Sequence, residues 1–277
     1  MELSIIIVSY NVAEILESNL KSVLNSSYKD FEIIVIDNAS EDNSLDIIGD
    51  NFPEIKLIKN EINLGFAKAV NQGIKISQGK YILLLNPDME LLPDSLEKTI
   101  SWIKDNPQAV ITGPRLIKKN KETIPSVRRF PRLCDQAMIV IKVPHIFPGV
   151  LNKYLIKDFD YNKEQEVDSV RGSFFLINRE AYKKITHKEP YLDERYFIWF
   201  EEVDFCRQVK ELGGKIYYTP QAQAIDLVGQ SFKQLKRSRT QGYFRDSMLK
   251  YFKKWQAKWQ YYILKILWAP INLLRNF

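Results

Sequence analysis

The chain has 277 residues, of which 45% are hydrophobic and 27% charged, so it can bury a large core and has the composition of a globular protein. A largely disordered chain and a multispanning membrane protein are both excluded. The two cysteines, Cys134 and Cys206, form no disulfide framework and have no metal-site spacing, so we expect a reducing compartment. Met1 and Glu2 lead directly into an apolar run, and no secretory signal is expected.

The first part of the chain alternates short apolar runs with helical patterns. Runs rich in Ile, Val and Leu at 5–8, 32–36, 55–58 and 81–85 predict buried strands. Helices are expected after each strand, over residues 11–24, 40–51, 66–77 and 93–106, with Asn11 capping the first. This alternation predicts an α/β fold with a doubly wound, mostly parallel sheet.

Regular patterning then lapses and returns. Residues 118–170 contain four scattered prolines, which predicts a long, partly mobile segment that could serve as an acceptor-facing lid. A buried strand at 173–177, a helix at 203–212 ended by Gly213 and a strand at 215–219 follow. We expect one domain over residues 1–231.

The remaining residues, 232–277, differ in composition. They hold 11 Lys or Arg against one acid, a local charge of about +10 within a net charge of +6. Three tryptophans, Trp255, Trp259 and Trp268, lie among these lysines, and the longest apolar run is too short to span a bilayer. We predict a basic, aromatic helical extension that lies on a membrane surface; the alternative is an ordinary packed helix.

Polar side chains follow the first two predicted strands. Ser9, Tyr10 and Asn11 follow one, and Asp37 and Asn38 follow the other. In doubly wound sheets, ligands bind beyond the carboxyl ends of the strands. These residues are therefore candidate contacts to a nucleotide, with helix capping as the alternative for Asn11.

The third strand is followed by a glycine turn. Asn63 and Gly65 precede a helix that carries Asn71, and the glycine permits a tight turn in which helix-terminal amides face a polar ligand. We include all three among the candidate binding residues.

The fourth strand ends in Asn86, Pro87 and Asp88, which places a carboxylate at the sheet edge. A hard divalent cation held by oxygen ligands is the usual means of stabilising a nucleoside diphosphate leaving group. We therefore expect Asp88 to bind Mg²⁺ or Mn²⁺ beside Asn86. A turn-forming aspartate after proline is the alternative.

Three acids stand among bulky aromatics further along, at the start of the predicted helix 203–212. Glu201 and Glu202 directly follow Phe200, and Asp204 comes two residues later. Acids favour helix N-termini, which is the structural explanation. Two adjacent acids in apolar surroundings can also supply a carboxylate of raised pKa that removes a proton from an acceptor hydroxyl.

The ordered set of these motifs resembles glycosyltransferase family 2, and within it the bacterial rhamnosyltransferase-like members. The resemblance covers roughly residues 4–231. It implies the GT-A fold, a Rossmann-like sheet. The motifs that carry it are residues 4–11, 35–40, 63–67, 85–88 and 200–204.

The resemblance also implies roles for individual residues. Asp37 would contact the nucleotide base, Asn86 and Asp88 would form a variant of the metal-binding DxD motif, and Glu202 would be the catalytic base. Asp226 stands where such enzymes often carry a histidine; either it is a second metal ligand or metal binding is weakened. Arg171 and Gly172 are expected to position donor phosphate or acceptor.

These inferences predict an inverting transferase that uses a divalent cation and a dTDP- or UDP-sugar, with rhamnose as a candidate. The expected acceptor is a glycan or lipid-linked glycan of cell-surface polysaccharide synthesis. The expected location is cytoplasmic and peripheral, at the inner face of the cell membrane. Two alternatives remain: a catalytically impaired family member that only binds nucleotide-sugar, and a nucleic-acid-binding protein, suggested by the sequence pI of about 9.0.

Overall fold

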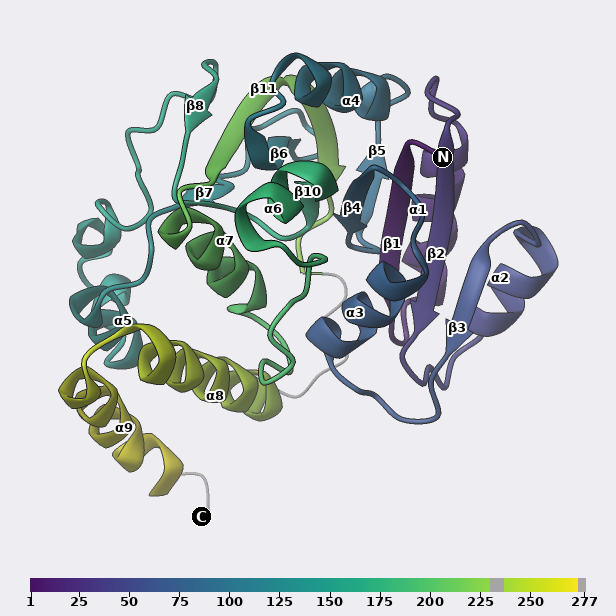
Figure 1. Ribbon diagram of the computed structural model, residues 1–277. Helices are drawn as coiled ribbons and strands as arrows, with labels where there is room; N and C mark the ends of the chain where they lie inside the picture. Colours follow the sequence, from purple (N-terminus) through teal and green to yellow (C-terminus); the bar gives the residue numbers. More distant parts are fainter. Residues whose placement is uncertain (230–236, 274–277) are drawn as a thin grey trace.

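The computed structural model describes residues 1–229 and 237–273. A central mixed sheet, flanked by helices on both faces, forms the body of the molecule (Figure 1). Its strands run in the order β3-β2-β1-β4-β10-β6-β11-β5, and β8 pairs with β11 beside this path.

The first half of the sheet is parallel, as predicted. Its strands are β1 (Leu3–Ser9), β2 (Phe31–Asp37), β3 (Lys56–Lys59) and β4 (Tyr81–Leu85). The register sets Ser9 opposite Asp37, so the polar residues that end β1 and β2 are neighbours. The helices α1 (Ala13–Leu24), α2 (Ser44–Asn51), α3 (Phe66–Ile76) and α4 (Ser95–Asp105) connect these strands to the rest of the sheet.

The second half is mixed, because β10 (Phe174–Asn178) lies antiparallel between β4 and β6 (Ala109–Ile117). The strand β11 (Lys215–Asp226) is parallel to β6 and pairs antiparallel with β5 (Met89–Leu91). This pairing sets Asp226 opposite Met89 and so brings Asp226 beside Asp88. The strands β5 and β6 were not predicted, and β11 is longer than the predicted strand.

Two cores lie on opposite faces of the sheet. One is formed with α1, α2 and α4; the other with α3, α6 (Arg179–Thr186) and α7 (Glu201–Glu211). In α1, for example, Leu16, Leu20 and Val23 have no exposed surface and share one helical face.

Residues 118–170 contain regular structure, contrary to the expected lapse. They include β7 (Val127–Arg128), α5 (Leu133–Val140), η1 (Val143–His145), η2 (Pro148–Leu151), β8 (Gln165–Glu166) and β9 (Ser169–Val170). These elements are too short for sequence periodicity to indicate, and β7 and β9 pair only with each other. The lid role of this segment stays a prediction.

The predicted C-terminal helices are present as α8 (Arg237–Trp255) and α9 (Lys258–Leu273). They lie beneath α7 and α5 (Figure 1) and share a third core with them. This core buries Val140, Tyr196, Phe200, Met248, Tyr251, Phe252, Leu264 and Trp268. The predicted boundary at residue 231 falls outside the described residues. Within the described ranges, none of the helices combines the length and apolarity that a bilayer crossing requires.

Candidate active site

Two adjoining cavities open at the sheet edge where the predicted residues gather. The smaller, the Tyr10 cavity, measures about 110 Å³, and the larger, the Glu202 cavity, about 470 Å³. Both are lined by Phe66, Asn86 and Ile198, so a ligand in one can extend into the other.

Asn38 organises the wall of the Tyr10 cavity. Its Nδ2 donates to Asn63 Oδ1 at 2.9 Å, and its Oδ1 accepts from the Leu64 amide at 3.0 Å. The turn ends at Gly65, whose φ of +85° favours glycine and whose Cβ, if present, would lie 2.6 Å from the Phe197 carbonyl oxygen. The predicted residues Tyr10, Asn38, Asn63, Gly65 and Asn86 all line this cavity.

Ser9 and Asp37 lie deeper, below the cavity wall. Asp37 is 1% exposed; its Oδ2 accepts from the Ser40 amide at 3.0 Å, and its Oδ1 has no hydrogen-bond partner among the described residues. Asn11 does not cap α1, which begins at Ala13, but has a φ of +52° and accepts from the Glu41 amide at 2.7 Å. Asn11 therefore joins the two strand-end loops.

The C-terminal helix α8 contributes to the Tyr10 cavity, which the sequence did not indicate. Arg239 and Tyr243 line it together with Phe197. The rings of Phe197 and Tyr243 stack with centroids 4.6 Å apart. No strand-end position marks these residues, and only the tertiary fold brings them to the cavity.

The Glu202 cavity unites the predicted metal-binding and catalytic residues. Its walls also contain Ser126, directly before β7, and Arg128, on β7. Neither of these two residues was predicted from the sequence. The predicted residues that line it are Asn86, Asp88, Arg171, Gly172, Glu201, Glu202 and Asp226.

Asp88 and Asp226 could hold a divalent cation. Both are buried, at 4% and 2% exposure, and the Leu227 amide donates to the Asp88 carbonyl at 3.0 Å. The described ranges contain no group of three or more His, Cys, Asp or Glu side chains arranged around a metal ion. Two carboxylates nevertheless fit Mg²⁺, which commonly takes one or two carboxylates and completes its shell with water and phosphate oxygens.

Arg171 competes for one of these carboxylates. Its Nε lies 3.5 Å from Asp226 Oδ2, an atom that also accepts from the Ser173 hydroxyl at 3.2 Å. Asp226 Oδ1 accepts from the Val228 amide at 2.7 Å. A cation at this position would share Asp226 with these donors.

Glu201 and Glu202 form an adjacent carboxyl pair, in which Glu201 is buried and Glu202 half-buried. Burial raises the pKa of Glu201 well above its ordinary value, and the neighbouring Glu202 raises it further. Burial also raises the pKa of Glu202, but the guanidinium groups of Arg128 and Arg171 oppose this rise. Glu202 is therefore the member that ionises more readily, and the Oε2 atoms of both have no hydrogen-bond partner in the part of the chain described.

Local backbone geometry places this pair. Trp199 and Phe200 have φ values of +64° and +68°, left-handed conformations that cost roughly 1–2 kcal/mol each in a residue with a side chain. Packing of Phe200 in the third core offsets this strain. On the other side, a Cβ at Gly172 would lie 3.3 Å from the Glu202 Cβ, so glycine leaves the acid its space.

Asp204 ties α7 to the C-terminal helices. It is fully buried, and four side chains donate to it: Tyr196 at 3.1 Å, Gln208 at 2.6 Å, Lys254 at 2.7 Å and Trp255 at 2.6 Å. Because α7 begins at Glu201, this network also fixes the start of the helix and the carboxyl pair there.

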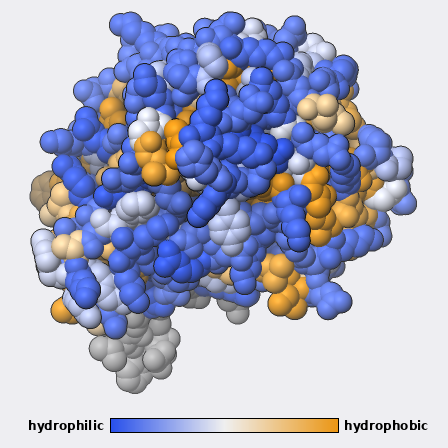
Figure 2. Space-filling view, in the orientation of Figure 1, coloured by the Kyte–Doolittle hydropathy of each residue, from blue (hydrophilic) through white to orange (hydrophobic). Residues whose placement is uncertain are grey.

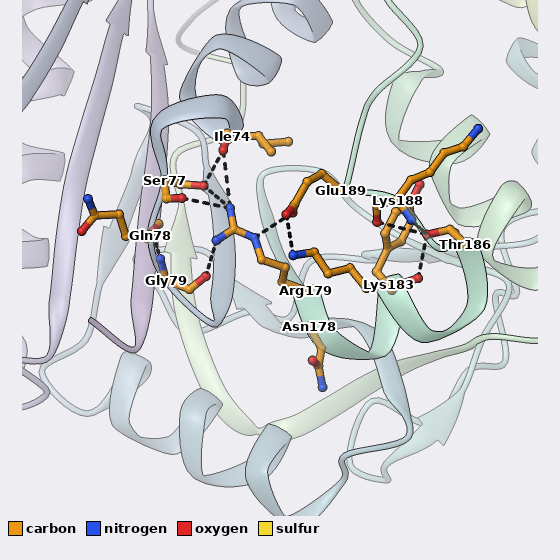
Figure 3. A network of polar contacts seen from close by, with 12 residues as sticks. Ile74, Ser77, Gln78, Gly79, Asn178, Arg179, Lys183, Thr186, Lys188 and Glu189 are labelled. Atoms are coloured by element: carbon orange, nitrogen blue, oxygen red, sulfur yellow. Dashed lines mark hydrogen bonds and ion pairs between the residues drawn. The ribbon is translucent and has the colours of Figure 1, made fainter.

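Asn71 lies away from both cavities. Its amide nitrogen donates to the Leu192 carbonyl at 2.8 Å, and its oxygen accepts from the Leu192 amide at 2.9 Å. It lines a separate cavity of about 540 Å³ beside Arg179. Arg179 joins Gly79 and Ser77, just after α3, to Glu189 (Figure 3), so its charge serves the fold there.

Comparison with known proteins places this geometry in a family. The model of glycosyl transferase family 2 matches residues 4–186. A relative from Mycobacterium tuberculosis, N-acetylglucosaminyl-diphospho-decaprenol L-rhamnosyltransferase, is 24% identical over 80% of this chain and 75% of its own length. The poly-β-1,6-N-acetyl-D-glucosamine synthase of Staphylococcus epidermidis is 35% identical over 44% of this chain and 30% of its own.

Solved structures share the fold. GalNAc-T7, solved with UDP, GalNAc and Mn²⁺, superposes with a TM-score of 0.62 and 17% identity over 90% of this chain and 48% of that one. A mannosyltransferase from Pyrobaculum calidifontis, in complex with GDP-Man and Mn²⁺, superposes with a TM-score of 0.61 and 15% sequence identity. The superposition covers 97% of this chain and 69% of that one. The predicted family and fold are confirmed: the chain belongs to glycosyl transferase family 2 and has the GT-A fold.

Proposed function

We propose that the chain is an inverting, metal-dependent glycosyltransferase that moves a hexose from a nucleoside diphosphate to a glycan or lipid-linked glycan of cell-surface polysaccharide synthesis. The observation that carries this proposal is the adjacent pair of buried Glu201 and half-buried Glu202 in the same cavity as Asp88. That cavity adjoins a second one whose mainly apolar wall carries the side chains of Asn38, Asn63 and Asn86, a combination suited to part of a nucleotide.

Glu202 is the proposed base. The acceptor oxygen attacks the anomeric carbon while its proton passes to the Glu202 carboxylate, and the bond from that carbon to the diphosphate oxygen breaks. One displacement inverts the anomeric configuration. Arg128 and Arg171 lower the pKa of Glu202 against the rise that burial causes, whereas burial and the neighbouring Glu202 both raise the pKa of Glu201, so Glu202 is the better proton acceptor of the two.

Asp88 and Asp226 would hold the cation, which when bound neutralises the charge of the departing diphosphate. Tyr10, Asn38 and Asn63 would bind the nucleoside, with Asp37 beneath them. Ser9 and Asn11 stabilise the loops that carry these residues.

The donor and acceptor are proposed from the relatives. A rhamnosyl donor, dTDP- or UDP-linked, is favoured by similarity to the mycobacterial enzyme, whose name also specifies a lipid diphosphate acceptor. Such an acceptor places the protein at the inner face of the cell membrane, with the basic segment 232–277 against the lipid surface.

Calorimetric titration with dTDP and with UDP, each with and without Mn²⁺, tests the donor site. We expect metal-dependent binding of one nucleotide, its loss in Asp88→Ala and its retention in Glu90→Ala, a nearby acid on β5 that pairs with Lys119. Failure of both nucleotides to bind under any condition would overturn the proposal.

A second assay separates an active transferase from an impaired one. The pairing of Asp226 with Arg171 is the observation that favours a protein that binds nucleotide-sugar without transferring it. Transfer or hydrolysis above background, abolished by Glu202→Gln while nucleotide binding persists, would exclude that alternative.

A further inference from the structure

An exposed apolar stripe runs along the outer face of α9. Trp259, Tyr262, Ile263 and Ile266 are 58%, 56%, 39% and 69% exposed. Their spacing of three and four residues sets them on one helical face. The opposite face carries the buried Leu264 and Trp268 side chains, so the stripe is additional to the face that packs in the third core.

A second exposed apolar group follows α5, in the middle of the chain. Ile141, Ile146, Phe147 and Val150 are 50%, 74%, 63% and 40% exposed, across η1 and the start of η2. Clusters of this kind are uncommon on a monomeric protein surface and mark an interaction site.

The third core holds the two groups in one arrangement. Val140, which ends α5, is buried in the same core as Leu264 and Trp268 of α9. Figure 2 shows orange and pale orange side chains along the lower left edge of the molecule, over the place where Figure 1 has α5 and α9. The two groups therefore lie on neighbouring elements that contact each other, and their exposed residues are together named the α5–α9 face.

The charge around the α5–α9 face has a single sign. Residues 136–157 and 247–277 contain no Asp or Glu, while exposed lysines include Lys142, Lys258 and Lys265. On α9, Lys258 and Lys265 stand four and three residues from Tyr262, beside the apolar stripe. Lysines in this position can extend to phosphate groups while the apolar side chains enter the acyl region.

We infer that the α5–α9 face docks on an anionic lipid bilayer, and that residues 141–150 form half of the contact. This inference deepens the proposed function and rests on it for the location of the acceptor. It extends membrane contact from the C-terminal segment to the middle of the chain. The same segment that was expected to face the acceptor would then also anchor the protein.

Flotation with vesicles of phosphatidylcholine, with and without phosphatidylglycerol, tests this inference on the full chain. We expect binding only with phosphatidylglycerol, and a loss of at least about tenfold in the double variants Ile146→Asn/Phe147→Ser and Ile266→Asn/Trp259→Ser. Lys265→Gln should reduce binding about fivefold. Ile62→Asn, at an equally exposed site outside the α5–α9 face, is the matched control and should bind normally.

Wild-type binding by the Ile146→Asn/Phe147→Ser variant would overturn the mid-chain half of the contact. Absence of vesicle binding by the wild-type protein, or a dimer that the same substitutions disperse, would overturn the bilayer as the partner. Quenching of tryptophan fluorescence by brominated lipids provides a second readout, and because the chain has five tryptophans, the contribution of Trp259 is the part of the quenching that Trp259→Phe removes.

Nucleotide binding measured by calorimetry should be unchanged in every docking variant, because these residues line neither cavity. Vesicle binding without nucleotide binding would refute the proposed transferase and leave the docking surface intact. Nucleotide binding without vesicle binding would refute the docking surface and leave the proposed transferase intact.

Discussion

Replacing Asp204 by asparagine should destabilise the fold by about 3 kcal/mol. The carboxylate is fully buried, and its Oδ2 accepts from Lys254 at 2.7 Å and Gln208 at 2.6 Å. An amide nitrogen there would face two donors. Removing one partner of a buried ion pair costs about 3–5 kcal/mol, and the lower value applies because Lys254 keeps Asp193 at 3.0 Å.

Urea unfolding monitored by circular dichroism measures this loss. Asp246→Asn, which removes a half-exposed acid paired with Arg245, is the control and should change the unfolding free energy by less than about 0.5 kcal/mol. Adding Lys254→Met to Asp204→Asn should recover part of the stability, since no unpaired ammonium then remains. A loss below about 1 kcal/mol for Asp204→Asn would refute the reasoning.

Three further predictions concern the cavities. Arg128→Gln removes a positive charge that lowers the pKa of Glu202, so the acidic limb of the kcat/KM profile should move to higher pH. Gly65→Ala should lower the unfolding free energy measured in urea, because its φ of +85° strains a side chain, whereas Gly49→Ala, with open space in α2, should raise this free energy by roughly 0.5–1 kcal/mol. Tyr243→Ala should weaken nucleotide binding by roughly tenfold in calorimetric titration without changing the urea midpoint appreciably.

Strands β1, β2 and β4 could be predicted because each is a largely buried apolar run, whereas β3 has only two half-buried apolar residues between exposed lysines and was indicated by its place in the alternation of strands and helices. The strand β6 could not, since Gly113 and Pro114 interrupt its pattern and its place in the sheet depends on pairing with the distant strands β10 and β11. The antiparallel position of β10 between β4 and β6 could not be predicted from the local sequence, because strand order and direction depend on pairing with residues that are distant in the chain.

The candidate site was predictable where function and strand ends coincide. Asp88 is the third residue after the end of β4, and Glu202 stands in a motif with aromatic neighbours. Arg128 and Tyr243 reach the cavities from elements whose placement depends on the tertiary fold. Asn71 was a candidate because its helix follows a strand end, but it has a structural role. Its side-chain amide donates to the carbonyl of Leu192, 121 residues further along the chain.

The third core has a consequence for the order of events during protein synthesis. Phe200, directly before the catalytic pair, packs against Tyr251 of α8, which leaves the ribosome later than the whole central sheet. A nascent chain can form the sheet and its strand-end loops before α8 is available to pack against the strained turn at Phe200. Glu202, the proposed base, should therefore reach its final position only after α8 has been synthesised, so that translation stalled before α8 would yield a folded sheet in which this position is not yet fixed.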